Sequence, residues 1–370
     1  MSYKPGGRLP MHSEARYLSN SDVGRATWPT RPASFKPQCT QNQMPDSSLH
    51  AADKAGDTLT TTYIADEAGT PRDDATPATR TLQPTRSARM RIDCDLAYQV
   101  DGPTEFVFLI HATPGPNQVL IDEDLHIEPA TDFRTYSDER SGNRFLRLQA
   151  QAGPLNLRYR ATVDRLIEAQ DKNAQEVAVH DIPDNVLRFL MPTRYCESDH
   201  LGHATQKLFG NLPRGFSRVQ AITDWVHNNV EYKLGSSNAT TTARDVFVQR
   251  AGVCRDFAHL SITLCRALNI PARIVCGYCP FPEPPPDFHA IFEAYLGGRW
   301  VRFDATGMAP VESVVRVAAG RDAKDVAFAT IYGPARMTSM SPEISPVAGG
   351  AYASATRQLD LPDWQSGNSA

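Results

Sequence analysis

The sequence predicts an α+β protein: a small antiparallel β-sandwich domain, followed by a core in which helices precede an antiparallel sheet. Three observations lead to this fold class. Apolar and polar residues alternate in short segments between residues 90 and 163, with Gly and Pro between the segments. Helical periodicity replaces the alternation at residues 221–268. Strand patterns return between residues 272 and 304.

Residues 1–88 differ from the rest of the chain. They are rich in Pro, Ser, Thr, Asp and Arg, and they show no sustained period of 3.6 or 2. Such a composition buries too little apolar surface to offset the entropy lost on ordering, so we expect a disordered extension. The change of character at Met90 suggests that translation starts there, which the intact mass of the natively expressed protein would test. A flexible tail is expected at residues 346–370.

Four segments predict the strands of the N-terminal β domain. Residues 90–96 alternate apolar and polar side chains, as a half-buried strand does. The other three segments are residues 105–110, 143–148 and 155–163. Short strands with Gly and Pro turns favour an antiparallel sandwich, which we place at residues 89–170.

The second domain is predicted at residues 171–345. A helix is expected at residues 221–230 and another at residues 241–250, with Thr242 or a neighbour as its cap. A third helix begins at Cys254. The strands that follow are expected at residues 272–278, 289–296 and 300–304.

Cys254 is the candidate nucleophile. Gly252 ends the preceding helix or permits a tight turn, and the next apolar residues fall on one helical face: Phe257, Leu260, Leu264 and Leu268. Cys254 therefore lies at a helix N-terminus, where free backbone N–H groups and the helix dipole favour a thiolate and could bind an oxyanion. A lone cysteine is more often a buried structural residue, so this reading depends on a base nearby.

His289 is the candidate base and Asp304 its orienting acid. Gly297-Gly298 separates two strand patterns, which predicts a two-residue hairpin. If Leu296 faces Arg299, paired residue numbers sum to 595, so that Glu293 faces Arg302. His289 and Asp304 then lie on one face, diagonal to each other and within reach. An acid held against a histidine ring fixes its tautomer and stabilises the imidazolium. An incidental surface hairpin is the weaker alternative.

Two residues near Cys254 are given structural roles. His259 lies five positions further on, about 140° around the helix from Cys254, and is expected to pack or hydrogen-bond elsewhere. Asp256 is expected to stabilise the helix N-terminus by its charge.

Composition excludes several function classes. The 370 residues carry a net charge of −4, which provides no basic field for nucleic acid. No apolar run is long enough for a membrane span, and no secretory signal is visible. Seven cysteines, an odd number, do not suggest a disulfide framework, so a reducing cytoplasmic setting is expected. The oligomeric state is open.

Metal chemistry is the lesser alternative. Cys276 and Cys279 have CxxC spacing, but alternation along a strand would separate them onto opposite faces. Cys196, His200 and His203 are expected to be solvated in a polar loop; as metal ligands they would imply a chelator-sensitive hydrolase. No metal or organic cofactor is expected. The proline-rich residues 280–287 are expected to form a stiff loop beside the substrate cleft.

The ordered motifs resemble those of the bacterial transglutaminase-like family. They are Gly-Val-Cys-Arg-Asp-Phe-Ala-His-Leu at residues 252–260, the segment at 267–273, Gly277-Tyr278, His289-Ala290 and Trp-Val-Arg-Phe-Asp at 300–304. The resemblance covers roughly residues 90–350 and includes the family's N-terminal β domain. It implies a papain-like core with Cys254 as nucleophile, His289 as base and acid, and Asp304 as orienting residue.

This sequence departs from the family pattern after the acid. The family's last motif often continues Asp-Pro-Thr, whereas here Ala305 replaces the proline, which affects only the local turn. Animal transglutaminases use a Trp side chain for the oxyanion; we do not assign Trp225 to that role, and the oxyanion side chain stays open.

The resemblance implies acyl transfer through a thioester on Cys254. If water is the second acceptor, the protein is a cysteine peptidase or amidase that acts on peptides or proteins. We favour this interpretation because water is abundant and no binding feature for another acceptor can be identified in the sequence. A lysine amine would make it a protein-glutamine transglutaminase. A non-catalytic peptide-binding module is the alternative of another class, and the reactivity of Cys254 would distinguish it.

Overall fold

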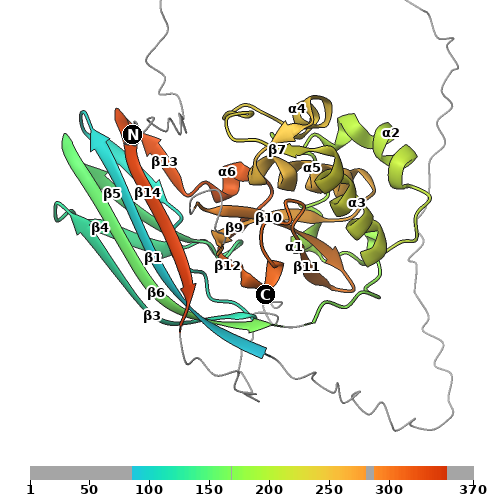
Figure 1. The fold of residues 1–370 in the computed structure, drawn as a ribbon, viewed down its shortest axis with the longest axis horizontal. Coiled ribbons are helices and arrows are strands. Elements are labelled where there is room, and N and C mark those ends of the chain that lie inside the picture. Colours follow the sequence, from blue (N-terminus) through green and yellow to red (C-terminus); the bar gives the residue numbers. More distant parts are fainter. Residues whose placement is uncertain (1–85, 168, 281–286, 348–370) are drawn as a thin grey trace, which may run out of the picture. The chain divides into compact units, whose positions relative to one another are not determined.

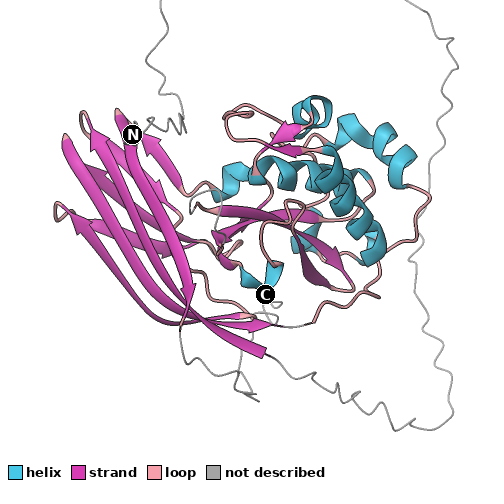
Figure 2. Ribbon diagram, in the orientation of Figure 1, coloured by secondary structure: helices cyan, strands magenta, loops and turns pink. Residues whose placement is uncertain are grey.

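The computed structural model describes residues 86–167, 169–280 and 287–347. The chain builds a β-sandwich from residues at both ends of this part and an α/β core between them (Figures 1 and 2). The predicted α+β class is confirmed. The expectations for residues 1–85, the translation start, the C-terminal tail beyond residue 347 and the proline-rich loop at residues 281–286 lie outside the described residues.

Two antiparallel four-stranded sheets form the sandwich. One has the order β14–β1–β6–β3, and the other has the order β13–β2–β5–β4. The strands are β1 (Arg86–Val100), β2 (Thr104–Phe108), β3 (Gln118–Glu128), β4 (Phe133–Ser137), β5 (Arg144–Ala150), β6 (Gly153–Ile167), β13 (Ala329–Tyr332) and β14 (Ala335–Pro346).

The sandwich core follows from the alternation along the longest strands. From Met90 onwards every second residue of β1 is buried, including Ile92 and Leu96, and β6 places Ala161 opposite Ile92 and Leu157 opposite Leu96. Burial of one face per strand is what a period of two produces. The four predicted segments fall on β1, β2, β5 and β6, although residues 109–110 lie beyond the end of β2. Strands β3 and β4 were not predicted, because their residues are mostly exposed and polar.

The boundaries of the sandwich differ from the sequence-based expectation at both ends. Residues 171–345 were all expected in the second domain, but β13 pairs with β2 and most of β14 pairs with β1. Residues 86–88, expected in the N-terminal extension, belong to β1 and pair with β6. Alternation identifies a strand but not its partner, so these pairings could not be read from the pattern.

The core places a helix layer on one antiparallel sheet of order β11–β10–β9–β12. In Figure 1, α5 lies against β9 and β10, with α2, α3 and α4 around it. The helices are α1 (Asp184–Leu187), α2 (Ser198–Phe209), α3 (Phe216–Asn229), α4 (Ala243–Gln249), α5 (Cys254–Ala267) and α6 (Ala323–Val326), with 3₁₀ turns at Val179–Asp181 and Val311–Ser313. The strands are β7 (Glu231–Tyr232), β8 (Ala251–Gly252), β9 (Ala272–Tyr278), β10 (His289–Leu296), β11 (Arg299–Phe303) and β12 (Val315–Gly320).

Most predicted elements of the core are present. The helices predicted from residues 221, 241 and 254 correspond to α3, α4 and α5, and Thr242 caps α4 by accepting a hydrogen bond from the Asp245 N–H. Helix α2 was missed, because residues 196–203 were expected to form a polar loop. Its buried Leu201, Thr205 and Phe209 recur every four residues, a helical signal.

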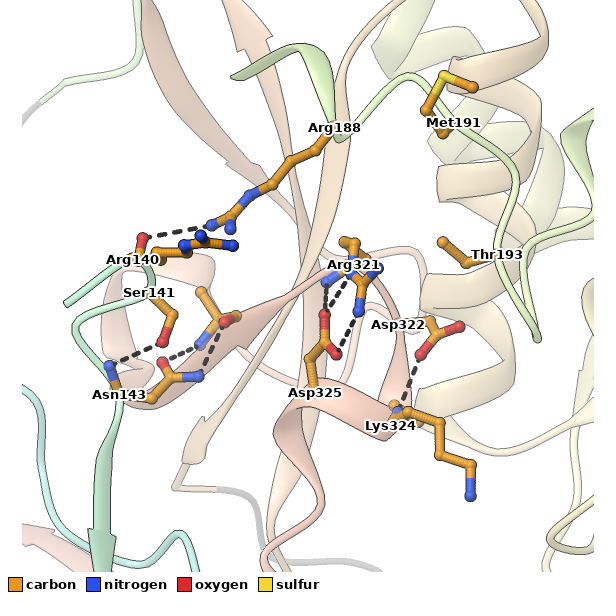
Figure 3. Close-up of polar contacts among 12 residues, drawn as sticks. Arg140, Ser141, Asn143, Arg188, Met191, Thr193, Arg321, Asp322, Lys324 and Asp325 are labelled. Atoms are coloured by element: carbon orange, nitrogen blue, oxygen red, sulfur yellow. Dashed lines mark hydrogen bonds and ion pairs between the residues drawn. The ribbon is translucent and has the colours of Figure 1, made fainter. Parts of the chain in front are cut away.

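Polar contacts join the sandwich to the core (Figure 3). The Asn143 side chain, at the start of β5, accepts a hydrogen bond from the Ala319 N–H at 2.9 Å and donates one to the Ala319 carbonyl at 3.0 Å. Arg188 reaches the Arg140 carbonyl at 3.3 Å, and Arg321 forms an ion pair with Asp325 within the core. The buried Asn143 side chain thus satisfies both backbone groups of Ala319 on the edge strand β12 and links the sandwich to the core.

No described helix combines the length and the apolar character needed to cross a lipid bilayer.

Candidate active site

Cys254 is the first residue of α5, and its half-buried thiol lies at the helix N-terminus. Val253 has an extended backbone, and its N–H donates to the Asp256 carboxylate at 2.9 Å. Arg255 forms an ion pair with the same carboxylate at 3.0 Å. Asp256 therefore caps the helix, as its position predicted, and holds the turn that presents Cys254.

Gly252 lets this turn form. A Cβ at residue 252 would lie 2.7 Å from the Asp256 Cβ, too close for any larger residue unless the capping side chain moves. From here α5 runs through a nearly continuous buried stretch and packs on β10. Because the helix is buried, the position of the thiol at its N-terminus is fixed. The first backbone N–H groups of a helix have no intrahelical partner, so this end of α5 carries a partial positive charge.

The hairpin of β10 and β11 brings His289 and Asp304 together. Its register is the predicted one, with Leu296 opposite Arg299 and Glu293 opposite Arg302. The φ angles of Gly297 and Gly298 are 57° and 79°, as the tight two-residue turn requires. Glu293 and Arg302 also form the predicted cross-strand ion pair, at 3.3 Å.

His289 and Asp304 form a buried hydrogen-bonded pair. The His289 Nε2–H donates to Asp304 Oδ2 at 2.9 Å, and the two side chains are 1% and 3% exposed. The other carboxylate oxygen of Asp304 accepts hydrogen bonds from the backbone N–H and the hydroxyl of Thr306, at 2.9 and 2.8 Å. Asp304 is thus fixed on both sides and orients the imidazole ring.

The imidazole also contacts the thiol. Burial lowers the pKa of His289, but its hydrogen bonds with Asp304 and with the Cys254 thiol, and the charges of both groups, raise that pKa to about 10. Because Nε2 is bound to Asp304, Nδ1 is the nitrogen left for Cys254. A protonated imidazole in this position is the counter-ion that a thiolate needs.

Tyr232 is a site residue that sequence reasoning missed. Strand β7 lies parallel to β8, with Tyr232 opposite Gly252, and the Tyr232 ring lies 5.9 Å from that of Phe257. Burial and the charge of the nearby Cys254 raise the Tyr232 pKa. It therefore remains a proton donor beside the nucleophile.

Trp225 does not approach this position as an oxyanion donor. It packs on the helix layer, stacked on Phe247 with ring centroids 5.7 Å apart, and the Arg250 guanidinium lies 4.6 Å from its ring centre. A two-residue strand such as β7 has no sequence period, so nothing in the pattern singled out Tyr232 in its place.

His259 is a structural residue, as its helix position predicted. It is buried, stacks on Tyr195 with ring centroids 5.1 Å apart, and accepts a hydrogen bond from the Ala323 N–H at 3.1 Å. Burial lowers the pKa of His259 well below its usual value, so the ring is neutral.

The cysteine and histidine spacings considered for metal binding do not describe one site. Cys276 and Cys279 lie in different apolar clusters on the two sides of the sheet, as strand alternation predicted. Cys196 is buried, whereas His200 and His203 are exposed on α2. The expectation that all three are solvated in a loop was wrong, because the helix buries the residues that precede it. Among the described residues, no group of three or more His, Cys, Asp or Glu side chains is arranged to hold a metal ion.

Comparisons with known proteins agree with this arrangement. The family model of the transglutaminase-like superfamily matches residues 203–305, and that of the bacterial transglutaminase N-terminal domain matches residues 88–185. A crystal structure from Cytophaga hutchinsonii, described as that of a presumed cysteine protease, is 44% identical with a TM-score of 0.67. That similarity covers 70% of this chain and 91% of the other.

Two curated mycobacterial relatives are uncharacterized proteins. The one from Mycobacterium leprae is 32% identical over 164 residues, which is 41% of this chain and 56% of that protein. The one from Mycobacterium tuberculosis strain H37Rv is 30% identical over 123 residues, 29% of this chain and 39% of that protein. The matches thus span about half or less of the length of these relatives.

Proposed function

Since this chain belongs to the transglutaminase-like superfamily and is a cysteine-based enzyme, we propose that it cleaves peptide or carboxamide bonds by hydrolysis through a thioester on Cys254. Its substrate would be a peptide or protein. In this proposal Cys254, His289 and Asp304 act as a catalytic triad, and no metal or organic cofactor takes part.

One observation carries the proposal. The thiol at the N-terminus of α5 hydrogen-bonds with His289, whose second ring nitrogen is bound to Asp304 at 2.9 Å. Candidate nucleophile, base and orienting acid thus lie next to one another in that order, with the base and the acid buried and hydrogen-bonded. A module that only binds peptides does not require a thiol, a histidine and a carboxylate arranged side by side in this order.

Acylation follows from the positions of these groups. The Cys254 thiolate attacks the carbonyl carbon, and the C=O π electrons move to the oxygen. In this proposal the backbone N–H of Cys254 and the hydroxyl of the neighbouring Tyr232 would donate hydrogen bonds to that oxyanion. His289 then gives its proton to the departing amine as the C–N bond breaks, which leaves a thioester.

Hydrolysis reverses the roles. Neutral His289 takes a proton from a water molecule, whose oxygen attacks the thioester carbonyl. The C–S bond breaks, the carboxylic acid leaves, and the thiolate is restored beside the imidazolium. Asp304 keeps Nδ1 of His289 directed at the thiol throughout both halves of the cycle.

The first test is the rate of iodoacetamide labelling at Cys254 against pH, in the native protein and in His289→Ala. Rapid labelling well below the pKa of a free thiol, lost in the variant, supports the Cys254–His289 pair. An ordinary thiol titration in both proteins would refute the catalytic proposal and favour a binding module.

The choice of acceptor needs a second measurement. A library of glutamine-containing peptides is incubated with the enzyme, with and without hydroxylamine, and the masses of the products are measured by mass spectrometry. Cleaved or deamidated peptides that form at the same rate in both conditions support hydrolysis. Products that require the amine would make the enzyme a transglutaminase.

A further inference from the structure

A cavity of about 750 Å³ lies away from Cys254, on the other face of the core sheet from α5. Phe292 and Ala294 of β10 pack in the main core with α5, whereas Glu293 and Tyr295, which alternate with them, line the cavity. Residues 115–118 and 165–167 of the sandwich form the opposite wall. A volume of this size is typical of small-molecule sites.

Arginine side chains dominate the charged wall of this cavity. Among its described lining residues are five arginines and three acids, an excess of two positive charges. The arginines are Arg165, Arg273, Arg299, Arg302 and Arg316, and the acids are Asp171, Glu293 and Glu312.

Only some of these arginines have a carboxylate partner. Glu293 pairs with Arg273 at 2.7 Å and with Arg302 at 3.3 Å, and so is shared by two guanidinium groups. Within the described part of the chain, Arg165 and Arg316 form no ion pair. Arg165 donates to the Gln118 side-chain oxygen at 3.3 Å and to the Glu312 carbonyl at 3.2 Å. The side chain of Arg316 donates to the Pro114 carbonyl at a long 3.4 Å.

Arg165 carries the least compensated positive charge of the cluster. The residue is only 3% exposed, and its Nε–H has no hydrogen-bond partner in the structure. Burial and the positive charges of Arg302 and Arg316 lower the pKa of Arg165 to about 9. A buried cation with an unused donor is costly unless a negative group completes its shell.

We propose that this cavity binds a small anionic ligand through a carboxylate or phosphate group held by Arg165 and Arg316. Guanidinium forks bind planar or tetrahedral oxyanions through paired hydrogen bonds. Trp300 and Tyr295, which also line the cavity, offer apolar surface for the rest of the ligand.

This site is separate from the proposed catalytic one. Glu293 lies four residues beyond His289 along β10, which is about 13 Å in an extended strand. The side chain of Ile291 lies between them, buried in an apolar cluster with Val275 and Val314. The ligand would therefore bind without contacting Cys254.

The test is isothermal titration of the full chain with sodium phosphate and, separately, with sodium succinate, at an ionic strength held constant with sodium chloride. We expect saturable binding of one or both. Binding of phosphate alone assigns phosphorylated ligands, binding of succinate alone assigns carboxylates, and binding of both assigns the shared oxyanion chemistry. Absence of binding of either at millimolar concentration overturns the proposal.

Variants tie the binding to these residues. Arg165→Gln and Arg316→Gln should each weaken the affinity at least about tenfold, because each removes a charge-assisted hydrogen bond. Arg158→Gln is the matched control, since Arg158 is exposed on the same strand β6 and pairs with Asp95. Unchanged affinity in both cavity variants, or an equal loss in the control, refutes the site. If Arg165→Gln does not fold, the half-buried Arg316 keeps the test decisive.

Discussion

Replacing Asp304 by Asn should slow the alkylation of Cys254 at neutral pH. Raising the pKa of His289 from 6.5 to about 10 corresponds to about 5 kcal/mol in favour of the imidazolium. The hydrogen bond and charge of Asp304, together with Cys254, supply this preference against burial, which opposes it. At pH 7 a tenfold loss of imidazolium requires the pKa of His289 to fall to about 6, a change of about 5 kcal/mol, which is the size of that whole preference. Without Asp304, only Cys254 opposes the effect of burial. We therefore expect labelling at pH 7 to slow at least about tenfold in Asp304→Asn.

The assay is the second-order rate of iodoacetamide labelling at Cys254, measured by peptide mass from pH 4 to 10. The native protein should label rapidly even at low pH, whereas Asp304→Asn should label slowly until an ordinary thiol ionises. Asp95→Asn provides the control, because that carboxylate pairs with Arg158 on the sandwich surface, away from the site. If the profiles of Asp304→Asn and native protein coincide, Asp304 does not stabilise the imidazolium and the reasoning fails.

Three further predictions follow from the same geometry. Tyr232→Phe should lower kcat by about 10²–10³-fold with little change in KM, because one oxyanion donor is lost; a change in KM alone would assign Tyr232 to substrate binding. Gly252→Ala should lower the free energy of unfolding by about 1–3 kcal/mol in urea titrations, because its Cβ would lie 2.7 Å from the Asp256 Cβ; an unchanged midpoint would show that the turn can shift without cost. Since the folded pKa of His289, about 10, exceeds the unfolded value of 6.5, its contribution to stability is complete below pH 6.5 and is lost as pH rises through 10; urea unfolding at pH 6, 8 and 10 should show this fall, and an equal fall in Asp304→Asn would assign it to other groups.

Local features of the sequence were enough to locate the β10–β11 hairpin and to place His289 beside Asp304. Two consecutive glycines accept the positive φ angles of a tight turn, and a strand period of two then determines which residues share a face. The distance between His289 and Asp304 follows from those two facts, because both lie in one hairpin. Helix α5 could also be predicted from the sequence, since its apolar residues recur at helical spacing directly after Cys254.

Residues brought together from distant segments could not be predicted in this way. Tyr232 reaches Cys254 only because β7 lies parallel to β8, a pairing of two residues on each side with no period of its own. Strand β14 is more than 200 residues from β1 in sequence, and its alternation of apolar and polar residues does not identify β1 as the strand with which it pairs.

The sequence by itself determined the order of the elements that it identified, the hairpin register and the candidates for nucleophile, base and acid. These depend on backbone preferences and side-chain periods within short segments. Only the tertiary structure decided that Tyr232 lies near Cys254, that β13 and β14 complete the sandwich, and that Arg165 and Arg316 share a cavity. The physical reason is that hydrogen bonds between strands are made by the backbone, which is the same in every residue, so the partner is selected by how the whole chain packs.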